Sequence, residues 1–200
     1  GQISEGNVGG GTGMICYEFK GGTGTSSRQI EISKNQYRVA ALVQANHGRR
    51  EDLTILGSPV GKHFTHDLMP RDHEFGSIIV IIATDAPLMP HQLKRLAKRG
   101  AIGIARGGTI GENGSGDIFL AFSTANEVPI ESMGSVNGAF EWTGDDLCDS
   151  IYEAAVQSVE EAVVNALIAA ESMDTLRPSG FPCSAINPTD LVAIVNRHQR

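Results

Sequence analysis

The chain of 200 residues has few cysteines, no long apolar run and no concentration of basic residues. Its three cysteines, Cys16, Cys148 and Cys183, form no Cys-x-x-Cys pair, which argues against a disulfide framework or a zinc–cysteine site. No apolar run approaches the roughly 20 residues that span a bilayer. The net charge of −7 comes without a basic stripe, so we expect no binding to nucleic acid or membrane.

The histidines offer no recognisable metal site either. His63-x-x-His66 and the following His73 lie in a polar stretch, and no carboxylate or cysteine completes a ligand set. Solvated loop histidines are the favoured interpretation, and we expect neither a metal nor a cofactor. Cysteine usage is typical of a reducing compartment, so we expect a cytoplasmic protein. The chain begins at Gly1 without a methionine, as a piece starting inside a longer protein would, which leaves a periplasmic location open.

What the chain does have is enough apolar sequence for one large domain with a core. Apolar residues make up 40% and charged residues 20%, and the 24 glycines fall mostly in discrete clusters. Period-two patterns predict strands, and helical spacing with end signals predicts helices. The predicted strands cover residues 14–20, 28–33, 37–45, 77–84, 101–105 and 117–123, and the predicted helices cover 88–99, 145–172 and a segment after Asn187-Pro188. This order indicates a layered α/β fold with mixed or antiparallel sheets between helices.

Two glycine-containing segments connect predicted strands. Residues 21–24 (GGTG) are predicted to form a turn between strands. Residues 49–76 are polar, with scattered glycines and prolines, and are too long for an ordinary turn, so we expect a mobile connector.

That connector ends at Gly76-Ser77, directly before the apolar run 78–82 (IIVII). A serine hydroxyl can attack the preceding carbonyl, shift the acyl group from nitrogen to oxygen, and let water free the ester. Glycine at position 76 would allow a strained backbone. The released Ser77 α-amine, with a reference pKa of about 7.7–8.0, would be a suitable general base beside its own hydroxyl. On spacing alone, a plain turn before a strand remains the more ordinary interpretation.

Three further residues could complete such a site. Asn46 ends a predicted strand, and its side-chain amide could donate to an oxyanion. Ser115 and Asp117 lie at the start of another strand, where they could orient the Ser77 amine. Each also has a plain reading as a turn residue. The glycine cluster 9–13 could cradle phosphate, but no strand precedes it and no lysine follows it.

The longer motifs favour the catalytic interpretation. They are residues 6–14 (GNVGGGTGM), 43–46 (VQAN), 76–88 (GSIIVIIATDAPL), 113–117 (NGSGD) and 121–126 (AFSTAN). In order along most of the chain, they resemble the DmpA / β-aminopeptidase family, peptidase family S58, whose members are L-aminopeptidase D-Ala-esterase/amidases and β-aminopeptidases.

The resemblance implies a four-layer αββα sandwich, related to ornithine acetyltransferase, and a precursor that cuts itself before a serine. Residues 1–76 would be the C-terminal part of the α-chain and residues 77–200 the β-chain of a single domain. Ser77 matches the nucleophile, Asn46 the oxyanion asparagine, and Ser115 and Asp117 the two supporting residues, the latter sometimes Glu. The family's oxyanion tyrosine and much of its substrate pocket would precede Gly1.

The implied activity is release of small N-terminal residues, such as L-Ala, D-Ala or β-amino acids, from peptides, amides and esters, by a homo-oligomer of αβ units. Two alternatives stay open. One is an acyltransferase of the ornithine acetyltransferase type, against which Ser77 argues because that family uses threonine. The other is a non-catalytic member that acts as a binding module.

Overall fold

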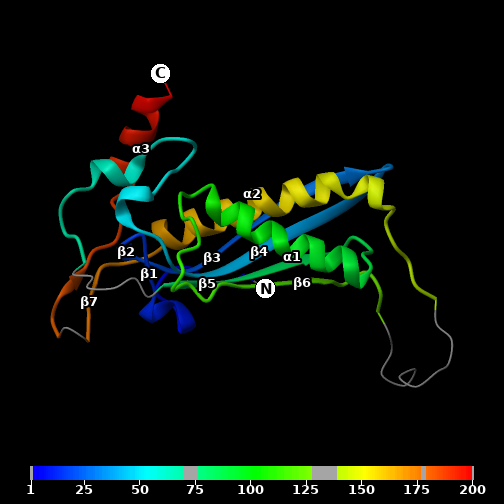
Figure 1. Cartoon of the computed structure of the whole chain (residues 1–200), viewed down its shortest axis with the longest axis horizontal. Helices are drawn as coiled ribbons and strands as arrows, with labels where there is room; N and C mark the ends of the chain where they lie inside the picture. The colour runs from blue at the N-terminus through cyan, green and yellow to red at the C-terminus, as the bar shows by residue number, and fades with distance from the viewer. Residues whose placement is uncertain (1, 70–75, 128–138, 177–178, 200) are drawn as a thin grey trace.

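The computed structural model describes residues 2–69, 76–127, 139–176 and 179–199. Its centre is a four-stranded sheet in the order β3–β4–β5–β6. The strands β3, β4 and β5 are antiparallel, and β6 runs parallel to β5. Two helices, α1 and α2, lie side by side over one face of the sheet (Figure 1). The bounds are β3 (Gly22–Ile32), β4 (Asn35–Asn46), β5 (Ser77–Thr84), β6 (Ile118–Ser123), α1 (Pro90–Ala105) and α2 (Asp149–Ile168).

Most of the smaller elements lie near one end of the sheet (Figure 1). Two short antiparallel ladders pair β1 (Ile15–Cys16) with β2 (Phe19–Lys20) and β7 (Met173–Asp174) with β8 (Pro182–Cys183). The 3-10 helices are η1 (Gly9–Gly13), η2 (Arg50–Asp52), η3 (Val60–His63) and η5 (Asp145–Leu147). The last helix, α3 (Pro188–His198), packs near η3. It begins as predicted, because the Asn187 side chain accepts hydrogen bonds from the backbone N–H groups of Thr189 and Asp190.

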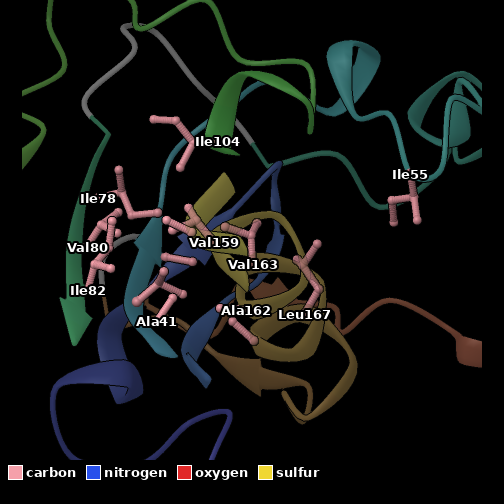
Figure 2. Close-up of a cluster of buried hydrophobic side chains, with 14 of the residues drawn as sticks. Ala41, Ile55, Ile78, Val80, Ile82, Ile104, Val159, Ala162, Val163 and Leu167 are labelled. Atoms are coloured by element: carbon pink, nitrogen blue, oxygen red, sulfur yellow. The ribbon is translucent and has the colours of Figure 1, made fainter. Parts of the chain in front are cut away.

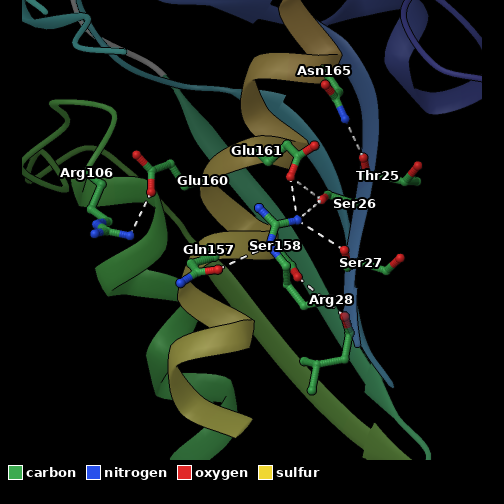
Figure 3. Close-up of polar contacts among 11 residues, drawn as sticks. Thr25, Ser26, Ser27, Arg28, Arg106, Gln157, Ser158, Glu160, Glu161 and Asn165 are labelled. Atoms are coloured by element: carbon green, nitrogen blue, oxygen red, sulfur yellow. Dashed lines mark hydrogen bonds and ion pairs between the residues drawn. The ribbon is translucent and has the colours of Figure 1, made fainter. Parts of the chain in front are cut away.

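The core lies between the sheet and the helices. Alternate residues of β5, Ile78, Val80 and Ile82, are fully buried and point toward the helix layer, as Figure 2 shows. They meet the apolar side of α2, which includes Val159 and Val163. Polar contacts tie α2 to β3 at the margin (Figure 3). The Arg28 guanidinium lies 2.5 Å from the Glu161 carboxylate, and Asn165 donates to the Thr25 carbonyl oxygen at 2.8 Å.

The opposite face of the sheet is apolar and uncovered in the described residues. Ile79, Ile118, Leu120 and Phe122 are each between 42% and 57% exposed on this face. The predicted α/β fold is thus confirmed, and the described residues contribute one helix layer and one sheet layer of a sandwich. A further sheet layer, as in the predicted αββα arrangement, would cover this face.

The predicted turn at residues 21–24 is wrong, because Gly22 and Gly24 belong to β3. A Cβ at Gly24 would lie 1.9 Å from the carbonyl oxygen of Ala162, so glycine here lets α2 approach the strand. The turn lies earlier instead, at Tyr17 and Glu18, which both adopt positive φ angles.

The predicted strand at 101–105 is also wrong, because α1 continues through these residues to Ala105. In the sequence, Gly100 indicates a helix end, but in the structure it lies inside α1 and packs against β6. A Cβ there would lie 2.4 Å from the Phe119 ring of β6, and one at Gly103 would lie 2.7 Å from Val159 of α2. The glycines therefore mark close packing inside a helix.

The expectation of a mobile connector at 49–76 fails for its first part. Residues 50–52 and 60–63 form 3-10 helices, and Leu53 and Val60 are buried. Arg50 is also buried, and its guanidinium donates to the carbonyl oxygens of Tyr17 and Glu18 at 2.9 and 2.5 Å. Residues 70–75, which precede Gly76, lie outside the described residues.

Candidate active site

Ser77 is the first residue of β5, at the end of the sheet. Its hydroxyl donates to the Gly76 carbonyl oxygen at 2.7 Å, and the Gly116 backbone N–H donates to the Ser77 Oγ at 3.0 Å. The hydroxyl is therefore held beside the peptide group that precedes it. Gly76 does not adopt a left-handed conformation; glycine is needed because a Cβ there would lie 2.8 Å from the Asn46 carbonyl oxygen.

Asn46 is the last residue of β4 and is the register partner of Ser77. Strand alternation directs both side chains away from the helix layer, toward the uncovered face of the sheet. The Asn46 Oδ1 accepts a hydrogen bond from the Ile15 backbone N–H at 2.9 Å. Among the described residues the Nδ2 group has no partner, so it is available as a donor near Ser77.

Ser115 and Asp117 lie on the other side of Ser77, just before β6. The Asp117 Oδ1 accepts from the Ser115 hydroxyl at 2.5 Å and from the Ile78 backbone N–H at 3.1 Å. The carboxylate thus binds the backbone one residue after the serine. All four residues predicted from the sequence lie at one end of the sheet, where Ser77 begins β5, Asn46 ends β4, and Ser115 and Asp117 precede β6.

The sequence reasoning missed Gly116 as a functional residue. Its backbone N–H is the donor to the Ser77 hydroxyl, a role that any residue type except proline can fill. The signal was its position inside the NGSGD motif, between two residues that had been singled out for their side chains.

A buried pair of rings beneath the site was also missed. His47 follows Asn46, is 2% exposed, and makes an edge contact with the Tyr17 ring at 5.2 Å between centroids. Burial lowers the pKa of His47 to about 4, against a smaller opposing effect of the Asp117 charge, so this histidine is neutral at pH 7. Its Nε2 is buried without a hydrogen-bond partner in the described residues. The Tyr17 hydroxyl accepts from the Thr109 backbone N–H at 3.2 Å, and burial raises the pKa of Tyr17.

No metal-binding cluster of three His, Cys, Asp or Glu side chains occurs in the described residues. Among the predicted loop histidines, His63 contacts His198 ring to ring, and His73 lies outside the described residues. The three cysteines are all buried. Within the same parts of the chain, no helix has both the length and the apolar character needed to cross a membrane.

The glycine cluster 9–13 forms η1, and backbone carbonyl oxygens of this region accept hydrogen bonds from the buried Lys20 ammonium. The segment is held by a cation of the chain itself. This arrangement gives no support to phosphate binding at the cluster.

Comparisons with known proteins agree with these motifs. The model of peptidase family S58 matches residues 1–179. The chain is 44% identical to the β-peptidyl aminopeptidase BapA of Sphingosinicella microcystinivorans, over all of this chain and 53% of the relative. The chain thus spans about half the length of the curated relatives it matches.

Solved structures show the same correspondence in three dimensions. The L-aminopeptidase D-Ala-esterase/amidase of Ochrobactrum anthropi, described as a variant of the Ntn hydrolase fold, superposes with a TM-score of 0.92 at 52% identity, covering 100% of this chain and 54% of that one. A β-aminopeptidase of a Burkholderia species gives a TM-score of 0.87 at 43% identity, covering 98% and 55%.

Proposed function

Because this chain belongs to peptidase family S58, we propose that it forms part of a self-processing aminopeptidase or amidase whose nucleophile is Ser77. The observation that supports this most directly is the position of the Ser77 hydroxyl. It lies at the end of a rigid strand, 2.7 Å from the Gly76 carbonyl oxygen and opposite the Asn46 amide.

The first proposed step is cleavage of the chain. The Ser77 Oγ attacks the Gly76 carbonyl carbon, the C–N bond to Ser77 breaks, and the hydroxyl proton passes to the departing nitrogen. Water then hydrolyses the resulting ester, which leaves a Gly76 carboxylate and restores the Ser77 hydroxyl. The products are residues up to 76 as the end of the α-chain and residues 77–200 as the β-chain of one domain, held together by the β4–β5 ladder.

The second step is turnover of an external substrate. The free Ser77 α-amine accepts the hydroxyl proton as Oγ attacks the substrate acyl carbon, and it returns the proton to the leaving amine or alcohol. Water then hydrolyses the acyl ester on Oγ, which releases the acid and restores the Ser77 hydroxyl. Asn46 Nδ2 donates to the developing oxyanion. Asp117, held by Ser115 and the Ile78 N–H, supplies a negative charge that orients the α-ammonium when the amine is protonated.

The proposed substrates are peptides, amides and esters with small N-terminal residues, including L-Ala, D-Ala and β-amino acids. The names of the relatives from Ochrobactrum and Sphingosinicella support this class. The uncovered sheet face, toward which Ser77 and Asn46 point, would receive the remainder of the longer protein and complete the pocket. We further propose a homo-oligomer of αβ units in the cytoplasm.

The test is hydrolysis by the full-length protein of a panel of p-nitroanilides that carry N-terminal L-Ala, D-Ala, β-Ala or L-Leu. The proposal predicts turnover of the small residues, much slower release from L-Leu, and none by Ser77→Ala. A purified, folded protein that turns over none of the panel would contradict it, and binding of the same compounds without turnover would favour the non-catalytic alternative.

The acyltransferase alternative predicts that the acyl-enzyme reacts with an acceptor amine in preference to water. With N-acetylornithine and glutamate present, a transferase would pass the acetyl group to the acceptor amine faster than to water. We expect hydrolysis of the acyl-enzyme to be faster than transfer in this chain, because Ser77 stands where that family carries threonine.

A further inference from the structure

Lys20, at the end of β2, is a buried cation that the proposed mechanism does not use. It is 2% exposed, and its ammonium donates to three backbone carbonyl oxygens. These belong to Gly11 at 3.2 Å, Gly21 at 2.8 Å, and Met14. No carboxylate among the described residues forms an ion pair with it, and burial lowers its pKa. Burying a charge is costly, so the three contacts are what make the position tolerable.

One of these contacts leads directly to the site. The peptide group between Met14 and Ile15 has its carbonyl oxygen bound by Lys20 and by the Gly21 N–H at 2.9 Å. The N–H of the same peptide group donates to Asn46 Oδ1 at 2.9 Å. A single peptide group therefore joins the ammonium to the side chain proposed to bind the oxyanion.

This link has two physical consequences for Asn46. An ammonium at the carbonyl end polarises the peptide group and strengthens hydrogen bonding by its N–H. The N–H then fixes Oδ1, which determines which way the amide is turned and leaves Nδ2 as the group presented to the site. If Ile15 moved, the amide could rotate or flip and present the wrong atom.

Close packing holds the peptide in this place. A Cβ at Gly21 would lie 2.5 Å from the Ala45 carbonyl oxygen and 2.9 Å from the Cys16 nitrogen. Gly21, directly after β2, thus packs against the end of β4 at Ala45, one residue before Asn46.

We propose that Lys20 is a positioning residue for Asn46, acting through the Met14–Ile15 peptide group to present the Nδ2 donor to the oxyanion. The proposal rests on the oxyanion role proposed above for Asn46. It goes beyond that role because Lys20 would act without contacting substrate. Loss of the Lys20 ammonium would lower activity only through its effect on Asn46.

The test is a double-mutant cycle in the full-length processed enzyme. Lys20→Met, Asn46→Ala and the double variant are compared with the wild type by kcat and KM on the best anilide. We expect Lys20→Met to lower kcat about 10-fold, the scale of one charge-assisted hydrogen bond, with KM changed less than about twofold. In the Asn46→Ala background the same change should cost less than about twofold, because the group it positions is gone.

Gln92→Met is the matched control. Gln92 is also buried and donates to a backbone carbonyl, that of Thr143 at 2.8 Å, but it lies at the start of α1, away from the site. Any effect it has through general stability should be the same with and without Asn46. Thermal melting of each variant separates loss of fold from loss of rate, and Lys20→Gln, which keeps one neutral donor, replaces Lys20→Met if the latter does not fold.

Where a variant stays uncut, the rate of its own cleavage, followed by intact mass, replaces kcat in the same cycle. An equal loss from Lys20→Met in both backgrounds, or no loss in either, overturns the positioning role. An Asn46→Ala enzyme with wild-type kcat overturns the oxyanion role itself, so the two failures are distinguishable.

Discussion

Asn46 and Ser77 are directly opposed in the antiparallel ladder of β4 and β5, the last residue of one strand facing the first of the other. Opposed residues of such a ladder have Cα atoms about 4.5–5.5 Å apart. The amide donor and the hydroxyl are thus placed by a sheet whose inner face is packed, rather than by loops. This relationship gives the candidate site its rigidity.

We expect Asn46→Ala to lower kcat by roughly 10²–10³, the usual cost of removing an oxyanion donor, with a smaller effect on KM. Gln44→Ala is the matched control, since Gln44 lies two residues earlier on the same strand and face and bonds Thr23 rather than the site. Steady-state kinetics on the anilide panel would measure both. Comparable losses in the two variants would mean that Asn46 matters only for the strand.

Asp117→Asn should lower kcat at least about 10-fold while the melting temperature changes little. The amide keeps an acceptor for the Ile78 N–H but lacks the charge that orients the α-ammonium. Asp85→Asn is the control, because Asp85 also accepts a strand N–H, that of Arg38 at 2.6 Å, at the far end of the same sheet. Unchanged activity of Asp117→Asn would remove this carboxylate from the mechanism.

Acid should weaken the fold through His47. Its pKa is lowered to about 4 in the folded protein, whereas an unfolded histidine titrates near 6.5. Between these values the unfolded state binds the extra proton, so the free energy of unfolding falls as pH drops, by up to about 1.4 kcal/mol per pH unit from this residue. Its contribution is complete above about pH 6.5 and is lost toward pH 4.

Urea unfolding of the uncut Ser77→Ala chain at several pH values would measure this dependence. We expect His47→Gln to flatten the curve between pH 6.5 and 4. Identical pH slopes with and without His47 would contradict the prediction.

Gly24→Ala should destabilise the fold by about 3 kcal/mol or more, since its new Cβ would lie 1.9 Å from the Ala162 carbonyl oxygen and must push α2 from β3. Gly13→Ala, where a Cβ would have open space, should be nearly neutral. Thermal or urea unfolding compares the two. A well-tolerated Gly24→Ala would mean that the helix and strand pack less closely than the structure has them.

Two glycines show why parts of the fold could not be predicted from the sequence. In the sequence, Gly24 indicates a turn and Gly100 a helix end, because glycine usually marks such places. Their actual reason is contact with α2 and β6, which are distant in sequence. The sequence predicts Ser77 and Asn46 as strand-end residues, because each adjoins an apolar run that identifies its strand without knowledge of tertiary contacts.

Other features near the site could not be predicted from the sequence, because they depend on tertiary contacts. Lys20 reads as an ordinary strand-end lysine, and only the fold brings three carbonyl oxygens around it. Similarly, the polar stretch after Asn46 predicts a mobile connector, but the buried Arg50 ties it to the β1–β2 turn. The motif resemblance linked Asn46, Ser115 and Asp117 to Ser77, whereas local patterns alone favoured plain turns.

The central claim is that Ser77 cuts the chain before itself, and intact-mass analysis of the full-length protein after expression tests it most directly. Self-cleavage before Ser77 predicts two fragments divided between Gly76 and Ser77, the second of which begins Ser-Ile-Ile-Val on N-terminal sequencing. It also predicts an unbroken chain for Ser77→Ala. A wild-type protein that is active yet remains one unbroken chain, or that is cut at another bond, would contradict it.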